Sequence, residues 1–146
     1  MKFLYQLLSI TVLSVLIVGC QVKPVPIQYG ADACVFCKMN IVDNQHAAEL
    51  VTNKGKVFKY DAIECMINDT TRNKASDIAL YLVNDYSKPG NLTDATKASY
   101  LISESIPSPM GAYLSAFGDA AAAHQAQNKY KGRVYSWTTI QTTIKN

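Results

Sequence analysis

The first nineteen residues of this chain form an apolar segment that is distinct from the rest of the sequence. Lys2 is followed by a stretch from Phe3 to Val18 whose only polar side chains are uncharged. About sixteen residues is short for a helix that spans a bilayer, which needs about 20, but it is typical of a secretory signal peptide. Removal of this segment leaves about 125 residues, enough for one domain with a single hydrophobic core.

The segment ends in Ile17-Val18-Gly19-Cys20, which resembles the lipobox of bacterial lipoproteins. In that motif the cysteine is lipidated on sulfur and becomes the N-terminus of the mature protein. We therefore expect residues 1–19 to be a signal peptide, Cys20 to carry the lipid, residues 20–29 to form a tether and residues 30–146 to fold. Because two or three acyl chains hold a protein firmly on a membrane, we expect the domain to be anchored to a bacterial membrane, facing the periplasm or the cell exterior.

The folded part contains the same succession of elements twice. In the first half, Gly55 provides a turn between two strand-like runs, and Asp61 with Glu64 forms a helix-capping pattern. In the second half, the first strand pair is poorly marked. The expected elements are strands at 47–52 and 56–60, a helix at 61–72, a strand at 78–83, a turn-rich stretch at 84–91, a strand at 98–102, a helix at 110–128 and a strand at 133–140. We therefore predict an α+β domain made of two similar ββαβ halves, at about 30–90 and 91–146.

Charge and motifs argue against two large classes of function. The formal net charge is +3, which is too weak to indicate the basic surface of a nucleic-acid-binding protein. The sequence contains no G-x-S-x-G elbow, no phosphate-binding glycine loop and no H-E-x-x-H motif, and it has 2 histidines at distant positions. We expect neither a nucleic-acid partner nor an enzymatic activity.

The cysteines left after lipidation are odd in number. The chain has 4 cysteines, and assigning Cys20 to the lipid leaves Cys34, Cys37 and Cys65. In an oxidising compartment an odd number of cysteines cannot all be paired. At least one thiol should therefore be free, buried or bound to a metal ion.

The run Cys34-x-x-Cys37-x-Met39 places sulfur donors close together. Cys37 and Met39 are two residues apart, so in an extended chain both side chains project to one face. Cys34 can reach the same point if the chain turns. Thiolate and thioether are soft ligands that suit Cu(I) far better than hard ions. Because a neutral methionine sulfur binds weakly, such a site favours transfer of the ion over permanent storage.

Two other chemistries remain open for these cysteines. Cys34 and Cys37 could form a structural disulfide or a thiol-disulfide redox pair. Alternatively, Cys34, Cys37 and Cys65 could join a histidine in a structural zinc site. The residue pattern by itself does not separate these possibilities from a copper site.

The sequence resembles the NosL family, the nitrous oxide reductase accessory lipoproteins. The resemblance rests on Cys34-x-x-Cys37-x-Met39, on the helix entry that contains Cys65, on Pro109-Met110-Gly111 and on the ending at 132–137. It covers essentially the whole mature domain and includes the lipobox. One departure is Lys38, which stands where the family commonly has glycine.

This resemblance implies a function, a partner and a fold. It implies a Cu(I) chaperone that delivers copper to nitrous oxide reductase, to its copper-site assembly complex or to a related copper enzyme. It also implies a fold of two ββαβ units, similar to that of the organomercurial lyase. Similarity to a lyase fold is no evidence for lyase activity, because fold alone does not determine function.

Two residues outside the Cys-x-x-Cys-x-Met run are further candidates for ligands of the predicted copper site. His46 follows Met39 closely enough to fold back on it, and Met110 lies between Pro109 and Gly111 at the start of a predicted helix. A ligand at Met110 would let both halves share one ion. Cys65 and His124 fall inside predicted helices, and we favour a packing role for both. The predicted metal ligands are Cys37 and Met39, helped by His46 or Met110, with Cys34 as a further candidate.

Overall fold

The computed structural model describes residues 21–145. The predicted signal peptide at 1–19 and the predicted lipidation of Cys20 lie outside the described residues. Within residues 21–145, no helix combines the length and the apolar character that a bilayer crossing requires.

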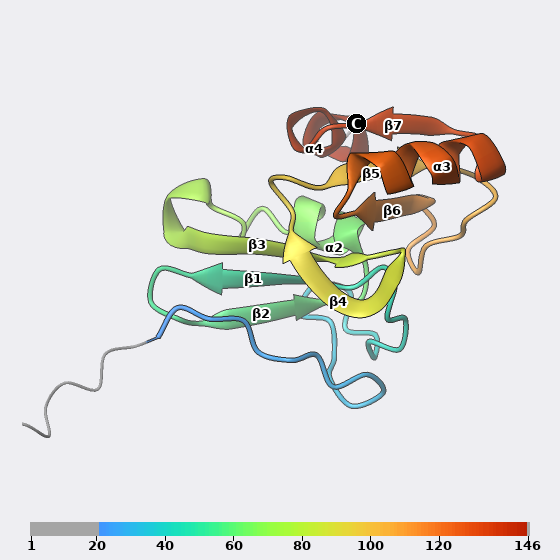
Figure 1. The fold of residues 1–146 in the computed structure, drawn as a ribbon. Coiled ribbons are helices and arrows are strands. Elements are labelled where there is room, and N and C mark those ends of the chain that lie inside the picture. Colours follow the sequence, from blue (N-terminus) through green and yellow to red (C-terminus); the bar gives the residue numbers. More distant parts are fainter. Residues whose placement is uncertain (1–20, 146) are drawn as a thin grey trace, which may run out of the picture.

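The described chain forms two antiparallel sheets (Figure 1). The four-stranded sheet has the order β2-β1-β3-β4, and its strands are β1 (Ala48–Thr52), β2 (Val57–Tyr60), β3 (Ile78–Asp85) and β4 (Lys88–Asp94). The three-stranded sheet has the order β6-β5-β7, and its strands are β5 (Ser99–Ile102), β6 (Leu114–Phe117) and β7 (Arg133–Tyr135). The helices are α2 (Ile63–Asn68), α3 (Ala120–Tyr130) and α4 (Trp137–Lys145), with a short 3₁₀ turn, η2, at Ala75–Asp77.

The predicted fold class is confirmed. The first half runs β1-β2-α2-β3 and the second half runs β5-β6-α3-β7, so each half is a ββαβ unit. Strand β4 and helix α4 are additions that follow the two units. Helix α2 lies between the two sheets and contacts β1 and β6 (Figure 1), so the start of α2 is enclosed by both halves. The similarity to organomercurial lyase stays a prediction.

Three local expectations are wrong. The expected helix at 110–128 begins only at Ala120, because residues 114–117 pair with β5 as strand β6. Asp119 then caps α3 by accepting a hydrogen bond from the Ala121 amide (3.1 Å). The turn-rich stretch at 84–91 contains the end of β3 and the first part of β4. The expected strand at 133–140 stops at Tyr135, before helix α4. Strand β6 forms by pairing with β5, and β4 forms by pairing with β3 across the short turn at 86–87.

The N-terminal segment contacts the first sheet within the predicted tether. The Val25 amide donates a hydrogen bond to Glu49 Oε1 of β1 (3.1 Å). Ile27 is buried in the core, and the Tyr29 hydroxyl donates to Asn84 Oδ1 (3.1 Å). The part of the predicted tether that follows Pro24 is therefore held on the domain.

Candidate metal centre

Three thiols and one carboxylate gather at the entrance to helix α2. The ligand atoms of Cys34, Cys37, Asp61 and Cys65 all lie within 4.8 Å of one another. Cys34 and Cys37 come from the turn before β1. Asp61 lies two residues before α2 and Cys65 lies in its first turn; the N-cap is Ala62 and no side chain caps the helix, so the expected capping by Asp61 is wrong. We call these four residues the thiol cluster.

Backbone hydrogen bonds shape the turn that carries two of the thiols. The Cys34 amide donates to the Met39 carbonyl (2.8 Å), and the Lys38 amide donates to the Cys34 carbonyl (3.1 Å). The Val35 amide donates to the Lys59 carbonyl of β2 (3.0 Å), which fixes the turn on the sheet. Lys38 has a φ of 70°, a left-handed conformation that glycine adopts without steric cost. This conformation explains why glycine would suit the position where this chain has lysine.

The carboxylate of the cluster is buried and only half satisfied. Asp61 is 2 % exposed. Its Oδ1 accepts a hydrogen bond from the Cys37 thiol (3.2 Å), whereas its Oδ2 is buried without a hydrogen-bond partner among the described residues. Buried polar atoms are nearly always partnered, so an orphaned acceptor needs an explanation. A cation held by the adjacent sulfurs would supply one.

The three thiols of the cluster differ in pKa. A hydrogen bond from Cys65 outweighs burial and lowers the pKa of Cys34 to about 6. Burial, with hydrogen bonds to Asp61 and Cys34, raises the pKa of Cys37 to about 11. The same hydrogen bond to Cys34, together with burial, raises the pKa of Cys65. Within the metal-free cluster, Cys34 is therefore the thiol that loses its proton most readily.

Of the five predicted ligands, Cys34 and Cys37 lie in the thiol cluster. Met39 and Met110 lie on surface loops with 51 % and 44 % of their area exposed. His46 is buried elsewhere and is no member of the thiol cluster.

His46 is held through both ring nitrogens, and its Nε2 contact links the two halves of the domain. Its Nδ1 lies 2.7 Å from Asp43 Oδ2, and its Nε2 lies 3.1 Å from Ser115 Oγ of β6. The order Asp, His, Ser matches that of a hydrolytic triad. Ser115, however, has no exposed surface, so a substrate cannot reach it. The arrangement is a buried hydrogen-bond network between the sheets.

Sequence reasoning missed two members of the cluster. Cys65 was favoured as a packing residue because it lies in a helix among apolar neighbours, and Asp61 was interpreted only as a helix cap. The zinc alternative did group Cys65 with Cys34 and Cys37, but with a histidine as the fourth ligand. In the structure Asp61 takes that place. The available signal was the position of both residues at the start of one helix.

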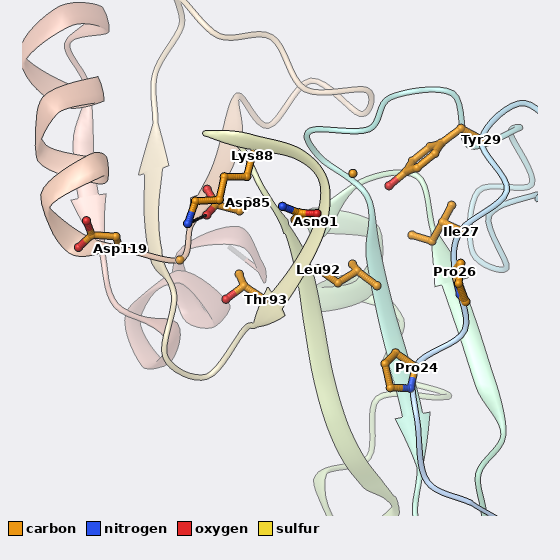
Figure 2. A pocket seen from close by; sticks show the side chains of 12 residues that line it. Pro24, Pro26, Ile27, Tyr29, Asp85, Lys88, Asn91, Leu92, Thr93 and Asp119 are labelled. Carbon is orange, nitrogen blue, oxygen red and sulfur yellow. Dashed lines mark ion pairs between the residues drawn. The ribbon is translucent and has the colours of Figure 1, made fainter.

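A groove lies beside the first sheet. Its volume is about 620 Å³, and it runs between the N-terminal segment and β4 (Figure 2). The lining residues are Pro24, Pro26, Ile27, Tyr29, Asp85, Lys88, Gly90, Asn91, Leu92, Thr93, Gly118 and Asp119. None of them belongs to the thiol cluster or to the predicted ligands. The sulfur chemistry of this chain is therefore separate from the groove.

Comparisons with known proteins agree on one family. The sequence profile of the NosL family matches residues 24–144. Among solved structures, the chain resembles that of the copper chaperone NosL from Shewanella denitrificans, with 20 % sequence identity and a TM-score of 0.69. The match covers 81 % of this chain and 95 % of that chain, so the shared fold spans about four fifths of this chain and nearly all of that one. No curated protein matches the chain in sequence.

Proposed function

This chain belongs to the NosL family, and we propose that it is a Cu(I)-binding chaperone rather than an enzyme. The observation that carries the proposal is the thiol cluster, whose four ligand atoms lie within 4.8 Å of one another. The orphaned Asp61 Oδ2 beside these sulfurs supports a cation at this place. The name of the structural neighbour, a copper chaperone, points to the same ion.

The donor set fits a soft ion that must later leave. The pKa of Cys34 is lowered, so this thiol loses its proton most readily and would bind first. Cys37 is partly exposed, whereas the other two thiols of the cluster are buried. It would therefore contact the ion as the ion enters or leaves. Buried Cys65 would complete a three-sulfur site, because thiolates satisfy Cu(I) at low coordination number. Asp61 Oδ1 would accept the hydrogen bond of a thiol that stays protonated, and Asp61 Oδ2 would face the ion.

We further infer the location and the recipient of the ion. The lipobox supports lipidation of Cys20 after removal of residues 1–19, so the lipoprotein would be anchored to a bacterial membrane and face the periplasm or the cell exterior. Family membership supports nitrous oxide reductase, or its copper-site assembly complex, as the recipient. A related copper enzyme is the other candidate.

Anaerobic titration of the reduced protein tests the proposal. Residues 21–146 contain the whole described fold, and a variant without residues 1–20 would be titrated with Cu(I) against a chromophoric chelator. We expect uptake of one ion and protection of all three thiols from alkylation. Cys34→Ser and Cys37→Ser should each weaken binding at least about ten-fold, whereas Ser105→Ala, an exposed serine outside the cluster, should not. Equal uptake by the Cys34→Ser, Cys37→Ser double variant would contradict the proposal.

A structural zinc site is the second candidate. Three thiols and one carboxylate supply the four ligands that structural zinc requires. This function predicts stoichiometric zinc in the purified protein and unfolding when a chelator removes it. The copper chaperone instead predicts a domain that stays folded without metal. Thermal unfolding of metal-free and zinc-loaded protein separates the two.

A further inference from the structure

The N-terminal segment approaches the first sheet from the end where β1 turns into β2 (Figure 1). Two hydrogen bonds fix its direction. The Tyr29 hydroxyl donates to Asn84, near the end of β3 that lies beside the start of β1, and the Val25 amide donates to Glu49, further along β1. The residues before Val25 therefore lead toward the turn at 53–56, which follows β1.

Few residues separate this pinned segment from the proposed lipid anchor. Five residue steps join Cys20 to Val25, and an extended chain covers at most about 3.5 Å per step. Lipidation of Cys20 would therefore hold the Val25 amide within about 18 Å of the lipid surface. A domain of this size is about 35 Å across. A tether this short favours contact between the membrane and the end of the sheet toward which the segment leads.

Three exposed lysines gather at that end of the sheet. Lys54 and Lys56 lie between β1 and β2, and Lys74 directly precedes η2. Asn53 joins η2 to the turn, because its amide and its side-chain Nδ2 each donate a hydrogen bond to a carbonyl of η2 (both 2.9 Å). We call Lys54, Lys56 and Lys74 the basic end.

The positive charge of the basic end is not neutralised within the domain. None of its three lysines forms an ion pair with another residue of the range 21–145. The neighbouring Arg72, in contrast, is paired with Asp69 (2.9 Å). The turn at 53–56 and residues 74–77 contain one acidic side chain, Asp77. Three lysines and one aspartate leave a net charge of +2 on this surface, which is complementary to anionic lipid headgroups.

The length of β1 separates the basic end from the thiol cluster. Strand β1 ends at Thr52, next to the basic end, and its first residue, Ala48, pairs with Tyr60. Asp61 of the thiol cluster follows Tyr60 directly. Four residue steps of a strand span about 13 Å. A domain that rests on its basic end would therefore hold the thiol cluster away from the lipid.

We propose that the basic end is a membrane-docking surface, on which Lys54, Lys56 and Lys74 contact anionic phospholipid headgroups and direct the thiol cluster away from the bilayer. The inference rests on the proposed lipidation of Cys20 and is independent of copper binding. Each lysine near an anionic surface strengthens binding about five-fold. A lipid anchor together with a basic patch gives a stable attachment, so the two features act on the same membrane.

Protection of lysines from acetylation tests this orientation. The full-length lipoprotein is reconstituted into vesicles of phosphatidylcholine with 30 % phosphatidylglycerol, or of phosphatidylcholine alone, and is treated with a trace of the membrane-impermeant N-hydroxysulfosuccinimide acetate. Mass spectrometry gives the rate at each lysine relative to Lys129, an exposed residue of α3. We expect the basic end to react at least about five-fold more slowly on the anionic vesicles than on the neutral ones. In 0.5 M NaCl, where charges are screened beyond about 4 Å, the difference should disappear.

A pair of charge variants tests whether these lysines cause the docking. In Lys54→Gln, Lys74→Gln, the remaining Lys56 serves as the reporter and should react equally fast on both kinds of vesicle. Lys88→Gln, Lys131→Gln removes the same number of charges from exposed positions outside the basic end. This control variant should retain the wild-type protection of Lys56.

Three results would overturn the inference. These are equal rates at the basic end on anionic and neutral vesicles, unchanged protection of Lys56 in Lys54→Gln, Lys74→Gln, and loss of that protection in the control variant. Failure of the wild type to float with vesicles in 0.5 M NaCl would instead refute the proposed lipid anchor, on which the inference rests. Flotation precedes every acetylation measurement, so the two failures are distinguished. A chain that docks in this way but takes up no Cu(I) would refute only the proposed copper function.

Discussion

Gly132 is the position where one added methyl group should damage the second half most. It lies between α3 and β7 with a φ of +99°, and a Cβ at this residue would lie 2.1 Å from the Ile102 carbonyl oxygen and 3.0 Å from Ser103 Cα. Gly90 is a matched control, because its φ is +82° and a Cβ there would meet no atom within 4 Å. Comparison of Gly132→Ala with Gly90→Ala separates the steric overlap from the backbone penalty.

The expected losses follow from these contacts. At Gly90 only the left-handed backbone disfavours alanine, by about 1 to 2 kcal/mol. At Gly132 the overlap with Ile102 forces the end of β5 to move, and such overpacking costs about 1 to 3 kcal/mol more. We therefore expect Gly132→Ala to lower the free energy of unfolding by about 2 to 5 kcal/mol, a large part of the total for a domain of this size.

Urea denaturation of the reduced, metal-free protein measures this difference. The only tryptophan in the chain, Trp137, packs against Tyr81 and Tyr100 with ring centroids at 5.4 and 5.8 Å, so its fluorescence reports the packing between the two sheets. Gly132→Ala should unfold at a urea concentration about 1 to 2 M lower than Gly90→Ala. Equal midpoints for the two variants would refute the steric argument and the close approach of Gly132 to β5.

Three further predictions concern named side chains. His46→Ala should lower the free energy of unfolding by about 2 to 3 kcal/mol, because it breaks a buried hydrogen-bond network. The Cu(I) affinity measured by chelator competition should change less than about three-fold. A ten-fold loss of affinity would instead indicate that His46 is a ligand. Burial alone would raise the pKa of Asp69, but hydrogen bonds from its neighbours, including Arg72, outweigh burial, and the net effect is a lowered pKa. The ionised Asp69 therefore stabilises the folded state fully above the unfolded pKa of about 4, and this contribution is lost as pH falls through the folded pKa. Asp69→Asn should consequently be less stable at neutral pH and show a shallower loss of stability below about pH 4 in urea titrations, and parallel curves for the two proteins would contradict this. Cys65→Ala should raise the pKa of Cys34 from about 6 towards the ordinary thiol value, since the Cys65 hydrogen bond is the main cause of the shift; a pH titration of thiolate absorbance that leaves the pKa unchanged would contradict the assignment.

Local signals in the sequence were sufficient for the first hairpin of the fold. The strand-like runs on either side of Gly55 became β1 and β2, because a hairpin is specified by residues that are close in sequence. Strand β6 had no such signal. Its partner, β5, is joined to it through loop 107–113, and the alanine-rich run that follows has a strong helix propensity. Pairing between distant segments therefore overrode local propensity at this point.

The same distinction applies to the thiol cluster. Cys34 and Cys37 were recognisable as a pair because they share one turn. Cys65 follows Cys37 at a distance that only the folded first half closes, since β1 and β2 intervene. Asp61 resembles a helix cap in the sequence, and only its burial beside three sulfurs distinguishes it. The sequence can indicate which residue types are available, whereas the fold determines which of them meet.

X-ray absorption at the copper edge tests the central claim most directly. The Cu(I)-loaded wild type should show a first shell of sulfur atoms, and Cys65→Ser should lose one sulfur from that shell while His46→Ala leaves it unchanged. A wild-type shell that contains an imidazole nitrogen, or one that Cys65→Ser does not alter, would contradict the assignment of copper to Cys34, Cys37 and Cys65.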